Sequence, residues 1–148
     1  MTFSIKKAEN KDLTEIVNLE RASFSDSWSE KTIGESLLNS NYSYFVLEDK
    51  GVICGYFCVL HVEDDFELLR ITVKNEFRGK GYGTAMMTKL KDFSKESGAS
   101  KIFLEVRTTN LPAKKLYEKS GFKKFSVRRN YYDGVEDADL YLCELGGE

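Results

Sequence analysis

The sequence is poor in the residues that build metal sites and imidazole-based catalytic sites. One of its 148 residues is histidine, His61, and three are cysteine. A single histidine argues against imidazole catalysis and against a histidine-rich metal site, so we expect no bound metal. An odd number of cysteines in apolar surroundings favours reduced thiols in the core over a disulfide framework. These thiols belong to Cys54, Cys58 and Cys143.

Two further absences limit where the chain acts and what it binds. The sequence has no apolar stretch of about 18 residues, the length at which a membrane-spanning helix is indicated. Residues 1–8 contain neither a long apolar run nor a small-residue cleavage pattern, so we expect a cytoplasmic protein with no membrane partner. The formal net charge is -2, which leaves no excess of positive charge to bind nucleic acid.

The remaining composition is that of an ordinary globular domain. Hydrophobic residues make up 41% of the chain and charged residues 31%. A chain of about 150 residues can bury roughly 68–70% of the surface that it exposes when unfolded. One hydrophobic core is therefore sufficient, and we predict a single domain over residues 1–148.

The order of the apolar patterns predicts an α+β architecture. Alternating or short continuous apolar runs indicate strands, and apolar residues three or four apart indicate helices. The predicted order is β-α-α-β-β-β-α-β-α-β-β, an α/β domain with a mixed, mostly antiparallel sheet of about seven strands flanked by about four helices. The predicted strands cover 2–8, 42–48, 52–61, 66–73 and 102–106, followed by a hairpin over 122–145 that turns near Asp133-Gly134. Strands 66–73 and 102–106 are expected to be parallel, and the predicted helices cover 10–24, 29–38, 81–98 and 112–120.

A glycine-rich turn lies between the fourth predicted strand and the third predicted helix, with the sequence Arg78-Gly79-Lys80-Gly81-Tyr82-Gly83-Thr84. Glycines let a backbone approach a ligand closely, and the first N–H groups of a helix favour phosphate oxygens. The turn is therefore a candidate pyrophosphate site, although a tight strand-to-helix connection would use the same glycines. It lacks the Gly-Lys-Ser/Thr spacing of nucleoside triphosphatases. It nearly meets the dinucleotide fingerprint, but the remaining chain ends in a hairpin and cannot complete a doubly wound sheet.

The spacing Arg-x-x-Gly-x-Gly, at Arg78, Gly81 and Gly83, resembles the coenzyme A loop of the GNAT family of N-acetyltransferases. The likeness in element order covers nearly the whole chain. More specifically, several segments resemble the bacterial members that acetylate the amino-terminal alanine of a small-subunit ribosomal protein. The resemblance implies an acetyl-CoA-dependent enzyme whose partners are acetyl-CoA and a protein amino terminus. These segments are 104–107, Asn110, Ala113, 116–117, 121–122, 128–132 and 136–138.

The resemblance also implies roles for individual residues. In that family the end of the fourth strand binds the pantetheine arm, the glycine-rich loop binds the pyrophosphate, and an asparagine contacts the cofactor. A glutamate and a tyrosine act as general base and general acid. The matching cofactor positions are Ile71, Thr72, Val73, Arg78, Gly79, Lys80, Gly81, Tyr82, Gly83, Thr84 and Asn110, and the matching catalytic positions are Glu105 and Tyr117. The matching acceptor-side positions are Trp28, Tyr131 and Tyr132, where Asp26-Ser27-Trp28-Ser29 departs from the family's Phe-Pro-Trp-Ser.

The residues themselves support part of this chemistry. Acetyl transfer from a thioester needs a neutral amine, a stabilised oxyanion and a protonated leaving sulfur. Strand alternation puts Glu105 on the face of Phe103 and Arg107, where it is either a proton acceptor or half of a structural ion pair with Arg107. Tyr117 shares a helical face with Ala113 and is either a core tyrosine or a group whose hydroxyl reaches the site. Because a phenol pKa of about 10 exceeds a thiol pKa of about 8.5, a hydrogen bond to the thiolate is its expected contribution.

The residues themselves do not identify which amine accepts the acetyl group. An α-amino group has a pKa of about 7.7–8.0, against about 10.4 for lysine, so an amino terminus is more often neutral near pH 7. Two rival functions are acetylation of lysine side chains or small amines, such as polyamines or drugs, and acyl-CoA binding without turnover. The acidic residues of segment 63–67 are either an attraction for a basic peptide or solvated loop charges.

Overall fold

The protein is described by a computed structural model that covers residues 2–132 and 134–146. The elements follow the predicted order, and two short 3-10 turns, Asn10–Asp12 and Asn75–Phe77, join them. Of the predicted hairpin turn, Asp133 lies outside the described residues, and Gly134 has a φ of 72°. The strands are β1 (Phe3–Lys7), β2 (Tyr42–Asp49), β3 (Val52–Val62), β4 (Asp65–Val73), β5 (Lys101–Arg107), β6 (Lys123–Tyr132) and β7 (Glu136–Glu144). The helices are α1 (Leu13–Ser23), α2 (Glu30–Leu37), α3 (Tyr82–Glu96) and α4 (Leu111–Lys119).

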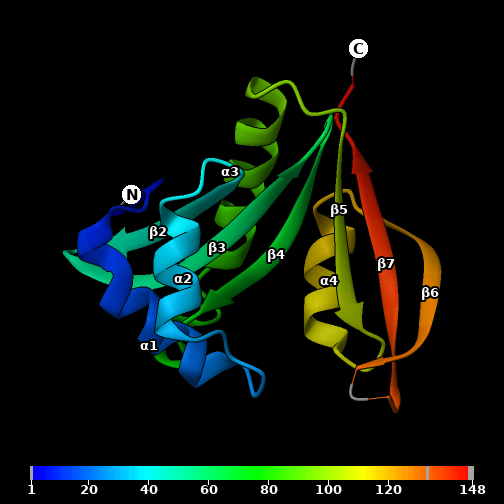
Figure 1. Cartoon of the computed structure of the whole chain (residues 1–148), viewed down its shortest axis with the longest axis horizontal. Coiled ribbons are helices and arrows are strands. Elements are labelled where there is room, and N and C mark those ends of the chain that lie inside the picture. Colours follow the sequence, from blue (N-terminus) through cyan, green and yellow to red (C-terminus); the bar gives the residue numbers. More distant parts are fainter. Residues whose placement is uncertain (1, 133, 147–148) are drawn as a thin grey trace.

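All of these strands belong to one sheet, in the order β1-β2-β3-β4-β5-β7-β6. Neighbouring strands run antiparallel except β4 and β5, which are parallel. The predicted single domain with a mixed, mostly antiparallel sheet is therefore confirmed. Figure 1 shows α1 and α2 on one face of the sheet, with α3 and α4 on the other. Within the described residues, none of these helices has the length and apolar character needed to cross a bilayer.

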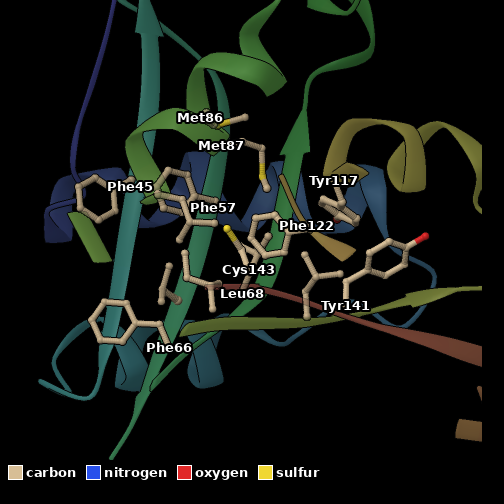
Figure 2. Close-up of a cluster of buried hydrophobic side chains, with 14 of the residues drawn as sticks. Phe45, Phe57, Phe66, Leu68, Met86, Met87, Tyr117, Phe122, Tyr141 and Cys143 are labelled. Atoms are coloured by element: carbon tan, nitrogen blue, oxygen red, sulfur yellow. The ribbon is translucent and has the colours of Figure 1, made fainter. Parts of the chain in front are cut away.

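The hydrophobic core has two layers, one on each face of the sheet. The first core layer packs α3 and α4 on the sheet through residues such as Phe57, Met86 and Tyr117 (Figure 2). The second core layer packs α1 and α2 on β2 and β3 through residues such as Ile16 and Tyr56. Burial of apolar surface in both layers fixes the helices on the sheet. The predicted core thiols are confirmed, since all three cysteines are buried and free: Cys54, Cys58 and Cys143.

Strands β4 and β5 pair only at their amino-terminal ends. Residues 65–68 pair with residues 101–104, and no pairing continues beyond Leu68 and Leu104. A bulge in β4 accompanies this separation, because Val59 of β3 pairs with Leu68 and Cys58 pairs with Arg70, which leaves Leu69 as an extra residue. A bulge bends its strand and increases the local twist. The two strands therefore diverge toward their carboxyl ends, as Figure 1 shows.

A buried carboxylate on β7 holds α4 beside this opening. Asp139 is 0% exposed and lies 2.7 Å from Lys114 Nζ of α4. It also accepts a hydrogen bond of 2.8 Å from the Thr108 hydroxyl, just after β5. Burial raises the pKa of the Asp139 carboxyl, but Lys114 and Thr108 more than offset this, so its pKa lies below the ordinary value. The ionised carboxylate thus ties α4 to the carboxyl end of β5.

We expect Asp139→Asn to destabilise the protein by about 3 kcal/mol, at the lower end of the cost of breaking a buried ion pair, because Lys114 can still reach solvent. Since the folded-state pKa is lowered, this difference should be complete above about pH 4 and should shrink as the pH falls further. Urea denaturation between pH 3 and 8 measures it. Asp92→Asn, at an exposed position of α3, is the control and should change stability by less than about 0.5 kcal/mol. Equal stability of both variants at pH 7 would rule out this role for Asp139.

Candidate active site

A cleft of about 620 Å³ lies between the separated ends of β4 and β5. Its walls are the carboxyl halves of these strands, the glycine-rich turn, the first turns of α4 and the end of α1. Because it passes between two strands of the sheet, the cleft is bordered by elements of both faces. Its volume is in the range of sites for organic ligands. In the described parts of the chain, no three or more His, Cys, Asp or Glu side chains gather to hold a metal ion.

The glycine-rich turn is shaped to receive an anion. Gly79 and Gly81 have φ values of 80° and 82°, and a Cβ atom at either would meet nothing within 4 Å. Gly81 is the N-cap residue of α3, and no side chain caps this end of the helix. The first N–H groups of α3 are therefore available to a ligand, at the end of the helix that favours negative charge. This arrangement fits the pyrophosphate of coenzyme A.

The carboxyl half of β4 offers main-chain groups to the cleft. Beyond Leu68 the edge that faces β5 has no strand partner, and Ile71, Thr72 and Val73 line the cleft. Besides its pairing with β3, two side-chain hydrogen bonds hold this segment: the Thr72 hydroxyl donates to Ser23 Oγ at 2.7 Å, and Arg78 Nε donates to the Val73 carbonyl at 2.9 Å. An extended amide such as pantetheine can hydrogen-bond to such an edge as an additional strand does.

Glu105 lines the cleft on the face of the sheet that bears α1 and α2. Its side chain is 18% exposed and forms an ion pair with Arg128 of β6, with 3.0 Å between Oε2 and Nη2. The expected alternative partner, Arg107, instead pairs with Glu136 at 3.0 Å. A hydrogen bond with Glu105 is the main reason that the pKa of Tyr131 is raised. The carboxylate is thus held by groups from the last hairpin while it remains open to the cleft.

Tyr117 lines the cleft from the opposite face. It is 8% exposed and belongs to the first core layer. Burial is the main cause that raises the pKa of its phenol, with a smaller effect of Tyr132. The phenol therefore stays neutral at physiological pH and can donate a hydrogen bond into the cleft. Glu105 and Tyr117 thus approach the cleft from the two sides of the sheet.

Most of the predicted site residues line this one cleft. Asn110 does so as the N-cap residue of α4, where its side chain accepts a hydrogen bond of 3.3 Å from Ala113 N–H. Tyr132 also lines it, and burial is the main cause that raises its pKa to about 12. Four predicted residues are not in its lining: Lys80, Thr84, Trp28 and Tyr131.

The lining also contains residues that the sequence patterns did not predict for the site, among them Phe24, Arg70 and Arg107. Phe24 follows α1, Arg70 belongs to β4, and Arg107 belongs to β5. The Cζ atom of Arg107 lies 4.2 Å from the ring centroid of Tyr132. The sequence could have indicated Arg70, because it is a charged residue within the apolar run of β4. A charged side chain in a strand with both faces covered requires a partner.

Comparison with known proteins agrees with this geometry. Residues 13–122 match the Acetyltransferase (GNAT) family. The ribosomal protein bS18-alanine N-acetyltransferase of Escherichia coli is 33% identical over 145 residues, which cover 96% of this chain and 97% of that relative. A crystal structure of the ribosomal-protein-S18-alanine N-acetyltransferase from Escherichia coli covers 99% of this chain and 96% of its own, with a TM-score of 0.90 and 31% identity. An N-alpha-acetyltransferase of Sulfurisphaera tokodaii is 30% identical, covering 97% and 93% of the two chains.

These matches extend over nearly the whole chain and include the cleft. The family uses acetyl-CoA, and the glycine-rich turn and the unpaired edge of β4 suit its pyrophosphate and pantetheine. The chain therefore belongs to the GNAT family and is an acetyl-CoA-dependent N-acetyltransferase.

Proposed function

We propose that this enzyme acetylates the α-amino group of a protein amino terminus, and that its acceptor is the amino-terminal alanine of a small-subunit ribosomal protein. The names of the relatives from Escherichia coli and Sulfurisphaera tokodaii support this acceptor class. The observation that carries the chemistry is the placement of Glu105 and Tyr117 on opposite sides of one cleft. Because ribosomes act in the cytoplasm, a ribosomal acceptor implies a cytoplasmic enzyme.

The proposed catalytic domain spans residues 1–148. β1 and the last hairpin share the sheet with the matched region, so they belong to the same domain.

In this proposal acetyl-CoA enters from the α3–α4 side of the sheet. Its pyrophosphate lies against Gly79–Thr84, where main-chain N–H groups and the positive end of the α3 dipole stabilise it. The pantetheine arm lies along Ile71, Thr72 and Val73, and Asn110 borders it from α4. The thioester then lies where the two strands separate. Bound acetyl-CoA supplies an activated acetyl group, and the protein supplies the proton acceptor and the hydrogen-bond donor.

The acceptor amine approaches from the α1–α2 side, where Glu105 lies. The amine must lose a proton to attack the carbonyl carbon, and Glu105 accepts it, directly or through a water. The ion pair with Arg128 orients the carboxylate before the amine arrives. As the new C–N bond forms and the C–S bond breaks, the sulfur leaves with the bonding electron pair, and the second proton that the nitrogen releases converts the thiolate to the coenzyme A thiol. Tyr117, on the other side, donates its hydroxyl hydrogen bond to that sulfur.

Aromatic and acidic groups surround the acceptor opening. Trp28 comes from the α1–α2 connection, and Tyr131 and Tyr132 come from the end of β6. Glu67 lies near Glu105, and burial followed by the charge of Glu105 raises its pKa. Rings offer stacking surface to a peptide backbone, and the carboxylates attract a protonated amine before its deprotonation. We propose that these residues bind the first residues of the acceptor.

Gly81→Glu should weaken acetyl-CoA binding by at least about 10-fold, because it puts a carboxylate where the phosphates bind. Calorimetric titration with acetyl-CoA measures the dissociation constant. Gly98→Glu is a matched control at the other end of α3: its φ is 87°, and its Cβ would also meet nothing within 4 Å. The backbone strain is therefore similar, and affinity should be retained. Equal affinities of the two variants would show that the pyrophosphate binds elsewhere.

A peptide that begins with alanine and contains one internal lysine should be acetylated first at its α-amine. Near pH 7 the α-amine is neutral on the order of 100-fold more often than the lysine amine. Fragment-ion mass spectrometry locates the label, and the same peptide with a blocked amino terminus is the control. Labelling of the lysine at an equal or greater rate would reassign the enzyme to side-chain acetylation. Absence of turnover with peptides and small amines would indicate a binding module.

Glu105→Gln should lower turnover by about 10²–10⁴-fold, because the amide keeps the volume of the side chain but accepts no proton. Residual activity should rise with pH as solvent deprotonates the amine. Steady-state kinetics from pH 6 to 9 and melting curves test this together.

Arg128→Gln is the matched variant for Glu105→Gln, since it removes the same ion pair and leaves the proposed base. It should retain more than about a tenth of the wild-type turnover. If both variants lose stability equally and keep near-normal turnover per folded molecule, Glu105 is a structural residue.

A further inference from the structure

The connection between α1 and α2 forms one wall of the acceptor side of the cleft. It spans residues 24–29 and contains no helix or strand. Phe24 and Asp26 of this connection line the cleft. Because its backbone is not held by a ladder or a helix, its conformation depends on side-chain contacts. One side chain, Arg70 of β4, supplies several of them.

The guanidinium of Arg70 lies against two aromatic rings of the connection. Its Cζ atom is 4.2 Å from the ring centroid of Phe24 and 4.4 Å from that of Trp28. Its Nη2 donates to the main-chain carbonyl of Asp26 at 3.1 Å and lies 3.7 Å from the Asp26 carboxylate. The Arg70 side chain is 13% exposed. A single cation thus contacts both ends and the middle of the connection.

A buried carboxylate of α1 holds this cation in place. Glu20 is 0% exposed and accepts a hydrogen bond of 3.0 Å from Arg70 Nε. It also accepts one from the Tyr56 hydroxyl and one of 2.8 Å from the main-chain N–H of Trp28. The charge-assisted hydrogen bonds of such a buried group restrict its geometry. Glu20 therefore fixes Arg70 and the end of the connection relative to the sheet.

The bulge in β4 gives Arg70 this orientation. Leu69, the extra residue, packs on the second core layer, and the next residue, Arg70, contacts α1 on the same face. Regular alternation would put neighbouring residues on opposite faces. The bulge at Leu69, which accompanies the separation of β4 from β5, therefore also directs Arg70 toward the α1–α2 connection.

We propose that Arg70 is a positioning residue that fixes the α1–α2 connection against the cleft and so sets the affinity for the acceptor. It acts through Phe24, Asp26 and Trp28. The inference rests on the proposed function in one respect, namely that the acceptor enters on the α1–α2 side. Lysine cannot replace arginine here, because its ammonium lacks the planar face that stacks on two rings and the fork that reaches Glu20 and Asp26 together.

The test compares Arg70→Lys and Arg70→Gln with the wild type. Arg70→Lys keeps a positive charge beside Glu20, so the protein should fold even if Arg70→Gln does not. For Arg70→Lys we expect the KM for the acceptor peptide to rise by about 5- to 30-fold. Turnover at saturating peptide and the dissociation constant for acetyl-CoA should stay within about 2-fold, because Glu105, Tyr117 and the glycine-rich turn are unchanged.

The protein contains a built-in probe of the connection, since Trp28 is its one tryptophan. Loss of the guanidinium that covers the indole should shift its emission to longer wavelength and raise its acrylamide quenching constant by about 2-fold. This measurement needs no acceptor. Arg21→Lys and Arg21→Gln are the controls, because Arg21 is an exposed arginine on the same helix as Glu20. They should leave fluorescence and KM unchanged.

Three results would overturn the proposal. An acceptor KM in Arg70→Lys that matches the Arg21 controls would mean that Arg70 only stabilises the fold. A raised KM with unchanged Trp28 fluorescence would mean that Arg70 binds the acceptor directly. If Arg70→Lys weakened acetyl-CoA binding by the same factor as it raised the acceptor KM, Arg70 would act on the cofactor site. If the wild type acetylates no peptide, the proposed acceptor class fails, whereas Trp28 fluorescence and the KM for the amine that it does acetylate still test Arg70.

Discussion

The separation of β4 from β5 is the constraint on which the functional architecture depends. Two parallel strands that paired along their whole length would close the sheet and leave no room between its faces. Here the pairing stops at Leu68 and Leu104, and the unsatisfied edge of β4 borders a cleft. An unpaired strand edge inside a protein is costly unless something bonds to it. A ligand with extended amide groups can satisfy that edge, so the feature that opens the sheet also favours a ligand of this kind.

Under the proposed mechanism, the opening through the sheet puts the proton acceptor and the hydrogen-bond donor on opposite faces. One face presents the Glu105 carboxylate, which is paired with Arg128, and the other presents the Tyr117 phenol, which burial keeps neutral. The two diverging strands also each carry an arginine that packs on aromatic rings of a neighbouring segment. Arg70 of β4 packs on Phe24 and Trp28, and Arg107 of β5 packs on Tyr132. The strands that border the cleft thus also hold the aromatic segments beside it.

The fold and the glycine-rich turn were predictable because their signals are local. Periodicity, the turn glycines and the order of elements gave the sheet, and Gly79 and Gly81 have the positive φ values that suit glycine. The surroundings of Glu105 depend on strand order and register, which periodicity does not encode. The sequence offers Glu105 a partner two residues away, Arg107, but its carboxylate pairs with Arg128, whose strand is separated from β5 by β7. The bulge was equally hidden, because an extra leucine at Leu69 extends an apolar run without changing its character.

The buried cysteines bear on how the reaction can be followed. Burial is the main cause that raises the pKa of all three thiols, in the case of Cys58 to about 12. Thiols of this kind are both protonated and shielded at neutral pH, so disulfide reagents react with them slowly. Each turnover, in contrast, releases coenzyme A with a free thiol in solution. A colorimetric thiol reagent added to the native enzyme would therefore count product molecules with little background from the protein.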